Sequence, residues 1–172
     1  MTADLEMFST SYAPTGEGIV TGKGGGDFDF LTGDWHIRHK KLKAGTKDVW
    51  QAFESSATVH PVLGGMGSIE ELRNPDRSNM GMGVRIWRPE MKQWADHWTS
   101  AENGVVNAPQ FGVFIDGEGV FISEEEVEGV KWQYRGVWDR ITLDTCRWHQ
   151  SVSKDGGNSW ERNWWMEWTR QA

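Results

Sequence analysis

The sequence has little of what would mark a disulfide-rich, membrane-spanning or nucleic-acid-binding protein. One of its 172 residues is cysteine, which excludes a disulfide framework within the chain and a cysteine-based zinc cluster. No run of about 18 apolar residues is available to cross a membrane as a helix. The 18 Lys and Arg residues are outnumbered by 25 Asp and Glu residues, and the formal net charge of −7 argues against nucleic acid and anionic membranes as partners.

The N-terminal stretch, residues 1–26, is polar and ends in a run of glycines. It carries Asp4 and Glu6 and has no basic start followed by an apolar segment, so we predict no secretory signal. Together with the single Cys146, this favours a cytoplasmic protein. We predict a flexible N-terminal arm, or a strap across one end of the molecule, in front of one folded domain at 27–172.

The chain as a whole is rich in glycine, with 21 residues, and in tryptophan, with 12. Segments in which apolar and polar residues alternate are joined by short turns, with no helical segment of about 10–15 residues between them. A long antiparallel meander usually closes, because closure removes the exposed strand edges. We therefore predict an all-β fold, an antiparallel up-and-down barrel of about 8–10 strands. The expected strands lie near residues 35–42, 48–59, 67–73, 82–87, 93–100, 110–115, 120–123, 131–140, 146–152 and 160–170.

The last predicted hairpin, residues 146–170, has the strongest strand pattern. Its turn contains Gly156 and Gly157, which tolerate the positive φ angles of a tight turn. Successive side chains of a strand point to opposite faces, so residues two apart share a face. The residues predicted to share one face are Trp160, Arg162, Trp164, Met166, Trp168 and Arg170.

The first predicted strand places Trp35, Ile37 and His39 on one face, and its apolar members predict that this face is interior. His36 then lies on the opposite face, so the two imidazoles cannot bind one metal ion together. No other metal or nucleotide motif is found, and we predict neither a metal nor a cofactor. The acidic run Glu124–Glu126 is interpreted as a solvated rim.

Polar residues on tryptophan-bearing strands are the candidate catalytic groups. Asp96 is the clearest, because Trp94 and Trp98 flank it at two-residue spacing and would carry it inward with them. Burial would raise the pKa of this carboxyl and suit it to acid–base chemistry. His97 then faces outward, and in the reverse register the two residues exchange roles. The candidate catalytic residues are Asp96, His39, Arg85 and His149.

The candidate ligand-binding residues are mostly indoles, since stacking and area burial hold planar molecules. They are Trp35, Glu70, Trp87, Trp94, Trp98, Arg135, Trp138, Trp148, Trp164 and Trp168.

The stretch Phe28-Asp-Phe-Leu-Thr-Gly-Asp-Trp35 resembles the Phe-Asp-Phe-x-x-Gly-x-Trp opening of a set of bacterial calycin-like proteins of largely unknown function. The resemblance continues over about residues 28–170 and implies a lipocalin-like barrel without assigning an activity. The further segments are Pro-Val-Leu-Gly-Gly at 61–65 followed by Glu70, Arg-Pro-Glu-Met-Lys-Gln-Trp at 88–94 followed by Trp98, and Ser-Lys-Asp-Gly-Gly-Asn-Ser-Trp at 153–160.

Two narrower resemblances concern the ends of the barrel. Gly33 and Trp35, with Arg170 late in the last strand, resemble the barrel-closing pair of lipocalins and fatty-acid-binding proteins, which implies a guanidinium stacked on an indole. The turn at 153–160 resembles the Asp box of sialidases, in which the role is structural. Nitrobindin-like proteins share a similar opening, but the chain lacks their Gly-x-Gly after Trp35 and its last histidine is His149, which disfavours haem.

Three functions fit these observations. The first is a cofactor-free enzyme of the lyase, isomerase or cyclase type, using an acid–base pair in a Trp-lined cavity. The number of ionisable groups on Trp-bearing strands favours it slightly, because a buried charge is costly unless paired. The alternative is a non-catalytic binding protein for a hydrophobic or aromatic small molecule. The third is an interaction protein whose Trp-rich faces pack between subunits, and a homodimer is left open.

Overall fold

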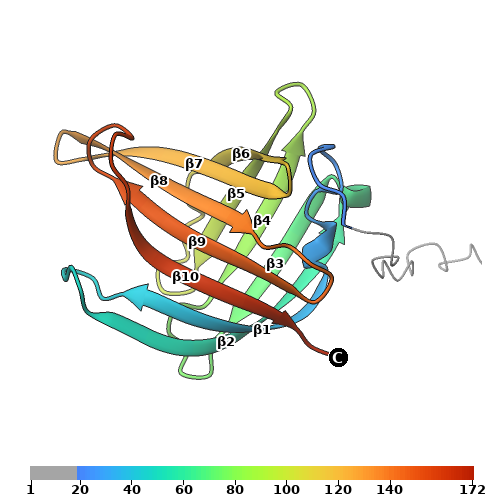
Figure 1. Cartoon of the computed structure of the whole chain (residues 1–172), viewed down its shortest axis with the longest axis horizontal. Coiled ribbons are helices and arrows are strands. Elements are labelled where there is room, and N and C mark those ends of the chain that lie inside the picture. The colour runs from blue at the N-terminus through green and yellow to red at the C-terminus, as the bar shows by residue number, and fades with distance from the viewer. Residues whose placement is uncertain (1–18) are drawn as a thin grey trace, which may run out of the picture.

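In the computed structural model, which describes residues 19–172, ten antiparallel strands form one closed barrel (Figure 1). Each strand pairs with its neighbours in sequence, and β1 pairs with β10 to complete the ring. This confirms the predicted all-β up-and-down barrel. The strands are β1 Gly33–Leu42, β2 Trp50–Val62, β3 Gly67–Arg73, β4 Gly81–Arg88, β5 Gln93–Ser100, β6 Gln110–Ile115, β7 Glu118–Val127, β8 Val130–Asp139, β9 Thr145–Ser153 and β10 Glu161–Arg170.

The acidic run Glu124–Glu126 is where the predicted strand bounds differ most from the structure. It lies inside β7, which is 10 residues long, although its three side chains are exposed as predicted. Its residues pair with β8, where Lys131 lies opposite Glu126 and donates to Glu124 at 2.5 Å. Pairing with β8 satisfies the backbone on one side of this run, while the β6–β7 ladder ends at Ile122, and Lys131 offsets part of the charge of the run.

The first strand has the predicted register. Trp35, Ile37 and His39 are buried, and His36 points outward and contacts Glu54 at 3.3 Å. The two imidazoles therefore lie on opposite faces of β1, as the two-residue period requires.

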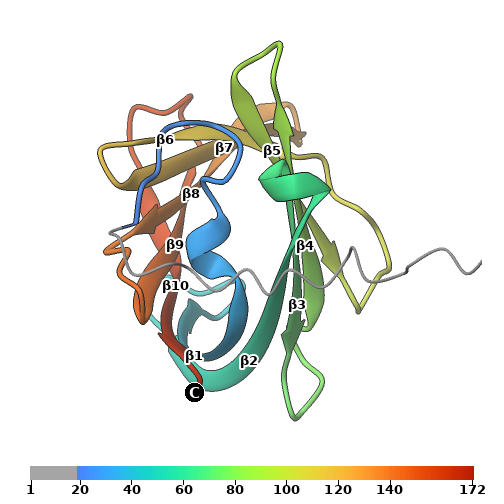
Figure 2. The same ribbon diagram turned by 90° about the vertical axis from the view of Figure 1, so that its right-hand side faces the viewer.

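One end of the barrel is filled by aromatic side chains from a short 3-10 turn, η2 (Asp29–Leu31), which lies inside the ring of strands (Figure 2). Phe28 and Phe30 are buried there. The ring of Phe28 meets Trp94 and Phe114 edge-on, with centroids 4.9 and 5.0 Å apart. This aromatic plug, defined by Phe28, Phe30 and Leu31, closes one half of the barrel by area burial and edge-to-face packing.

Arg170 fastens the plug to the end of β10. Its guanidinium carbon lies 4.3 Å from the centroid of the Trp35 ring. It donates to the carbonyl oxygens of Thr32 and Phe30, at 2.5 and 2.8 Å. Gly33, with φ of +116°, leaves room for this, since a Cβ there would lie 2.9 Å from Arg170 Nη1. The implied indole–guanidinium pair is therefore present.

The segment before the plug packs against the same end of the barrel. Gly24 lies against Trp87, so close that a Cβ would lie 2.5 Å from the indole, and the amide of Gly26 donates to Gly65 at 2.8 Å. Most of the predicted arm, residues 1–18, lies outside the described residues, so the arm and the domain boundary stay predictions. Within the described part of the chain, no helix has the length and hydropathy needed to span a membrane.

The turn between β9 and β10 has the hydrogen bonds that its resemblance to an Asp box implies. Asp155 accepts from the amide and the hydroxyl of Ser159, at 2.9 and 2.6 Å. These bonds lower the pKa of Asp155 to about 2. The indole of Trp160 donates to the carbonyl of Gly157 at 3.1 Å. The turn is thus built around its own side chains.

A bulge in β10 separates two groups of residues that were predicted to share a face. The register with β9 shifts between Arg162, opposite Ser151, and Trp164, opposite Gln150. A bulge inserts one residue and changes the phase of the alternation. Arg162 therefore points outward, while Trp164 and Met166 line the interior. The prediction of one uninterrupted face from 160 to 170 is wrong for its first part.

Candidate functional site

The half of the barrel beyond the aromatic plug encloses a cavity of about 430 Å³. Eight strands, β3 to β10, and the loop between β5 and β6 contribute to its wall. Its lining combines five indoles with polar and acidic side chains. The indoles are Trp98, Trp138, Trp148, Trp164 and Trp168.

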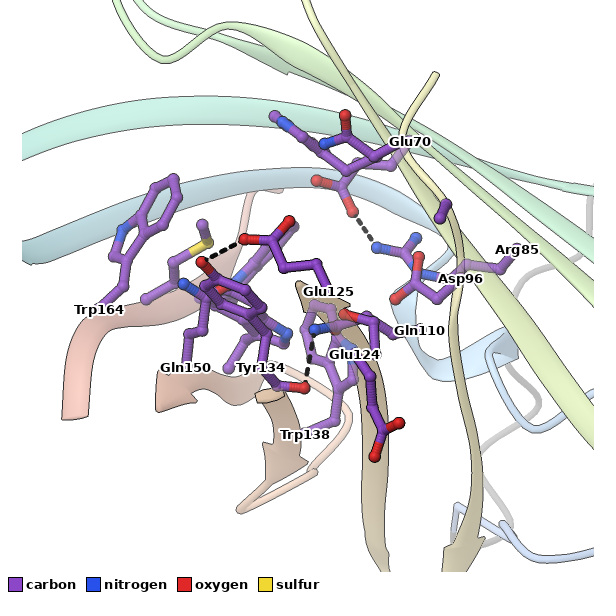
Figure 3. A pocket seen from close by; sticks show the side chains of 17 residues that line it. Glu70, Arg85, Asp96, Gln110, Glu124, Glu125, Tyr134, Trp138, Gln150 and Trp164 are labelled. Atoms are coloured by element: carbon purple, nitrogen blue, oxygen red, sulfur yellow. Dashed lines mark hydrogen bonds and ion pairs between the residues drawn. The ribbon is translucent and has the colours of Figure 1, made fainter. Parts of the chain in front are cut away.

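An ion cluster of Glu70, Arg85 and Asp96 lies on one side of the cavity (Figure 3). Arg85 on β4 stands opposite Asp96 on β5 in the pairing register, and Glu70 comes from the adjacent β3. Nη2 of Arg85 donates to Glu70 Oε2, and its Nε lies 3.5 Å from Asp96 Oδ1. Gly83 makes the space for this pairing, because a Cβ there would lie 3.1 Å from Arg85 Nη2.

Burial sets the protonation behaviour of this cluster. It raises the pKa of Asp96, and the charge of Glu70 acts in the same direction against the opposing charge of Arg85. Burial alone would disfavour the charged guanidinium, but the two carboxylates outweigh it and raise the pKa of Arg85. Arg85 therefore stays charged while Asp96 becomes easier to protonate, which is the behaviour of a group suited to proton transfer.

Besides Nε of Arg85, which has only the 3.5 Å contact with Asp96, three buried donors on the cavity lining have no acceptor among the described residues. They are Nη1 of Arg85 and the indole nitrogens Nε1 of Trp138 and Trp168. The guanidinium carbon of Arg85 lies 5.5 Å from the ring centroid of Trp138, and the Trp138 and Trp168 rings lie 5.3 Å apart. The three side chains thus form one neighbourhood at the deep end of the cavity, and an unpaired buried donor costs about 1–3 kcal/mol.

The remaining wall is aromatic and amphipathic. Trp148 and Trp164 meet edge-on with centroids 5.7 Å apart. The hydroxyl of Tyr134 donates to Glu125 Oε1 at 2.7 Å, and burial together with this bond raises the pKa of Tyr134 to about 12. Gln110 donates to the backbone carbonyl of Tyr134 at 3.4 Å. Tyr134 is therefore a protonated donor that holds the Glu125 carboxylate in place (Figure 3).

His39 faces inward but stands behind Trp164 and does not line the cavity. The Trp164 indole donates to His39 Nδ1 at 3.2 Å, so the ring proton lies on Nε2, which bonds the hydroxyl of Ser55 at 2.6 Å. The imidazole stacks on Phe53 at 4.3 Å. Burial, with the charge of Lys41, lowers the pKa of His39 to about 3. The ring is neutral near pH 7 and positions Trp164.

Two candidate residues lie outside the barrel wall. His149 is on the outer face of β9, 3.5 Å from Asp139, and burial together with the charge of Arg162 lowers its pKa to about 4. Arg135 is on the outer face of β8, 4.2 Å from the ring centroid of Trp160. The prediction that these two residues serve the cavity is wrong in placement. On β8 the cavity is lined by Tyr134 and Trp138, and on β9 by Trp148 and Gln150. Arg135 and His149 are each next to one of these residues in sequence and therefore point to the opposite face.

Three candidate indoles belong to the closed half. Trp35 is fully buried under Arg170, and its nitrogen donates to Leu31 at 2.6 Å. Trp94 is fully buried beside the plug, and Trp87 packs against it at 5.7 Å. They support the floor below the cavity and do not line it. The other candidates line it, namely Glu70, Arg85, Asp96, Trp98, Trp138, Trp148, Trp164 and Trp168.

Several residues that line the cavity were not predicted, although the two-residue alternation of their strands indicated them. Tyr134 shares a face with Trp138, and Glu125 has the same phase on β7 as the buried Phe121. Alternation alone would have placed both inward. The other lining residues that were missed include Gln110, Ser123, Gln150 and Met166.

Comparison with known proteins shows the fold and no family. No protein-family model matches the chain, and no curated protein matches its sequence. Among solved structures, an S-type phycobiliprotein lyase from Guillardia theta matches with a TM-score of 0.52 and 12% sequence identity, over 84% of this chain and 90% of that one. The likeness shows that the chain folds as a calycin-like barrel, which agrees with the sequence resemblance at the level of the fold.

Proposed function

We propose that the barrel binds a small planar molecule in its Trp-lined half. The cavity of about 430 Å³ lies within the range of roughly 300–1,000 Å³ in which proteins hold small ligands. Indoles provide large, rigid faces for a planar ring system. The likeness to a phycobiliprotein lyase supports a small-molecule site in this fold.

The observation that carries this proposal is the set of unpaired donors at the deep end. Arg85, Trp138 and Trp168 each present a buried N–H group with no acceptor among the described residues. A well-packed core of purely structural function pairs such groups, because each unpaired one lowers stability. A ligand oxygen placed between these side chains would supply the missing acceptors.

A second candidate function is proton transfer on the bound molecule, as in a cofactor-free lyase or isomerase. The raised pKa of Asp96, next to the charged Arg85, favours it. In this scheme the Asp96 carboxylate accepts a proton from the substrate and returns it at a second atom, or keeps it while a leaving group departs. Arg85 Nη1 donates to the oxygen on which negative charge develops, and Glu70 holds the guanidinium in place.

Binding is tested with two neighbouring indoles that differ in the face they occupy. Trp164 lines the cavity, while Trp165 stacks with Arg162 on the outer face, at 4.4 Å. In tryptophan-fluorescence titrations with planar aromatic compounds, we expect Trp164→Phe to weaken binding about tenfold, since part of the stacking area is lost. The matched control Trp165→Phe leaves the affinity unchanged. Equal affinities in both variants, or no response of the wild type to any compound, would contradict the proposal.

Catalysis is tested by Asp96→Asn, which keeps the shape of the side chain and removes its basicity. We expect product formation to fall about 10²- to 10⁴-fold while the ligand still binds. Asp116→Asn, in the exposed β6–β7 turn, is the control for loss of one carboxylate elsewhere. Turnover that survives in Asp96→Asn removes the acid–base role and leaves binding as the function.

A further inference from the structure

We propose that the molecule bound in this cavity is an organic cation, a planar protonated amine or a positively charged heteroaromatic compound. The proposal rests on the proposed binding function and names the ligand class of the same site. Three properties of the cavity carry it: the sign of its charge, the aromatic faces around that charge, and the unpaired donors at its deep end.

The charge of the lining is negative. Four carboxylates line the cavity, those of Glu70, Asp96, Glu124 and Glu125. Of the described lining residues, Arg85 alone carries a positive charge, so the formal charge is −3. A cleft whose charges are mainly of one sign concentrates oppositely charged ligands, because its low-dielectric walls focus the field.

The lining stays negative when ion pairing and protonation are taken into account. Glu124 points away from the other labelled carboxylates in Figure 3, and its charge is neutralised by the exposed Lys131. With Asp96 also protonated, Glu70, Arg85 and Glu125 still sum to −1. An anionic ligand therefore finds no uncompensated positive charge anywhere on the described lining, since Arg85 is already paired with Glu70 and Asp96.

The aromatic faces provide the second property. Indole rings attract cations through the negative potential of their faces. One indole of the cavity already binds a cation of the protein itself, since the Lys41 ammonium lies 3.7 Å from the ring centroid of Trp164. Trp98 and Trp148 offer further faces on the same lining. A planar cation between these rings gains stacking area and electrostatic attraction together.

The unpaired donors at the deep end complete the description of the ligand. Arg85, Trp138 and Trp168 need an acceptor, and the negative charge beside them disfavours a carboxylate or a phosphate. A neutral acceptor such as a carbonyl or ether oxygen meets both requirements. Glu125, held by Tyr134 nearer the outer ends of β7 and β8, is then the counter-charge for the cationic group.

The experiment compares three-ring probes of one shape and different charge. Proflavine is cationic at pH 7, acridone is neutral and anthracene-9-carboxylate is anionic. Dissociation constants are measured by fluorescence titration at low and at physiological ionic strength. We expect proflavine to bind at least tenfold more tightly than the carboxylate, and this ratio to shrink as salt screens the charges.

Substitution of two adjacent glutamates distinguishes the effect of charge inside the cavity from the effect of the net charge of the protein. Glu125 lines the cavity and its neighbour Glu126 does not, although both are exposed residues of β7. We expect Glu125→Gln to weaken proflavine about three- to tenfold and to leave acridone unchanged, whereas Glu126→Gln changes neither. Thermal unfolding of both variants verifies that they are folded.

The outcomes distinguish the proposed cationic ligand class from the proposed binding of a small planar molecule. If acridone or the carboxylate binds as tightly as proflavine, or if both glutamate variants behave alike, the cationic ligand class is wrong and the binding function stands. If none of the three probes binds, both proposals are overturned.

Discussion

His39 is an imidazole whose surroundings admit only the neutral ring. Its Nδ1 accepts from the Trp164 indole, its Nε2 bonds Ser55, and Phe53 covers one face. A proton on Nδ1 would oppose the indole N–H, and the site is buried. Through this ring the backbone of β1 orients an indole of the cavity, so His39 is a positioning residue.

The lowered pKa of His39 makes stability depend on pH. The unfolded imidazole titrates near 6.5 and the folded one near 3, so the unfolded state binds more protons between these values. This contribution is complete above pH 6.5 and is lost as the pH falls toward 3. The unfolding free energy of the wild type should therefore fall between pH 7 and pH 4. In His39→Gln we expect this fall to be smaller by about 3 kcal/mol, measured by urea denaturation at both pH values.

The outer histidine of the same strand is the control. His36→Gln, at an exposed position, keeps the wild-type difference between the two pH values. A His39→Gln variant that is as sensitive to acid as the wild type would show that the imidazole is protonated without penalty in the folded barrel.

Strand β10 is the element that joins the closed half to the cavity. Its C-terminal end carries Arg170, which ties the plug to Trp35, and its middle carries Trp164 and Trp168 on the cavity lining. The bulge before Trp164 separates these inward residues from Arg162 and Trp160. One strand thus holds the plug in place, lines the cavity and contributes to the outer surface of the barrel.

Removal of the clamp should destabilise the barrel. Arg170→Ala loses bonds to three carbonyl oxygens and the contact with the Trp35 ring, and we expect a loss of about 2–4 kcal/mol in unfolding free energy. Arg170→Lys keeps the positive charge but lacks the planar guanidinium. It should recover less than half of the unfolding free energy that Arg170→Ala loses. The exposed Arg38, paired with Glu167 on the same strands, provides the comparison: Arg38→Ala should cost less than about 1 kcal/mol. Similar losses at both positions would show that no special clamp exists.

At the scale of the molecule, the barrel has a filled half and a hollow half. The plug brings the aromatic mass of Phe28 and Phe30 to one end, and the cavity occupies the other. The boundary is formed by Trp138 and Trp168, which belong to the core and also line the cavity. The stable half holds these two rings in place, so the site is built on a rigid base.

A ligand that fills the hollow half should stabilise the whole barrel. A compound present at 100 times its dissociation constant adds about 2.7 kcal/mol, because it binds only the folded state. For a chain of 172 residues this corresponds to a rise in melting temperature of about 5–10 °C, measured by circular dichroism. The Trp164→Phe variant should show a smaller rise at the same concentration, and Trp165→Phe the full one. A compound that changes fluorescence without raising the melting temperature binds elsewhere.

The all-β class, the approximate number and order of the strands, and the phase of alternation within most of them could be predicted from the sequence alone. The sequence placed His39 with Trp35 on an interior face and Asp96 on one face with Trp98, but it left open whether that face or the face of His97 points inward. These are local properties, because the direction of a side chain follows from its position along one strand. Turns rich in glycine and asparagine likewise marked where strands end.

The interior residues that contact one another could be identified only in the folded barrel. Trp35 and Trp94 share an inward phase with Trp98, but the plug covers them and leaves Trp98 at the cavity. The pairing of Arg85 with both Glu70 and Asp96 depends on the register of three strands. Alternation along one strand carries no information about the height of a residue in the closed barrel. That height, set by register, the bulge and the plug, separates the core from the site.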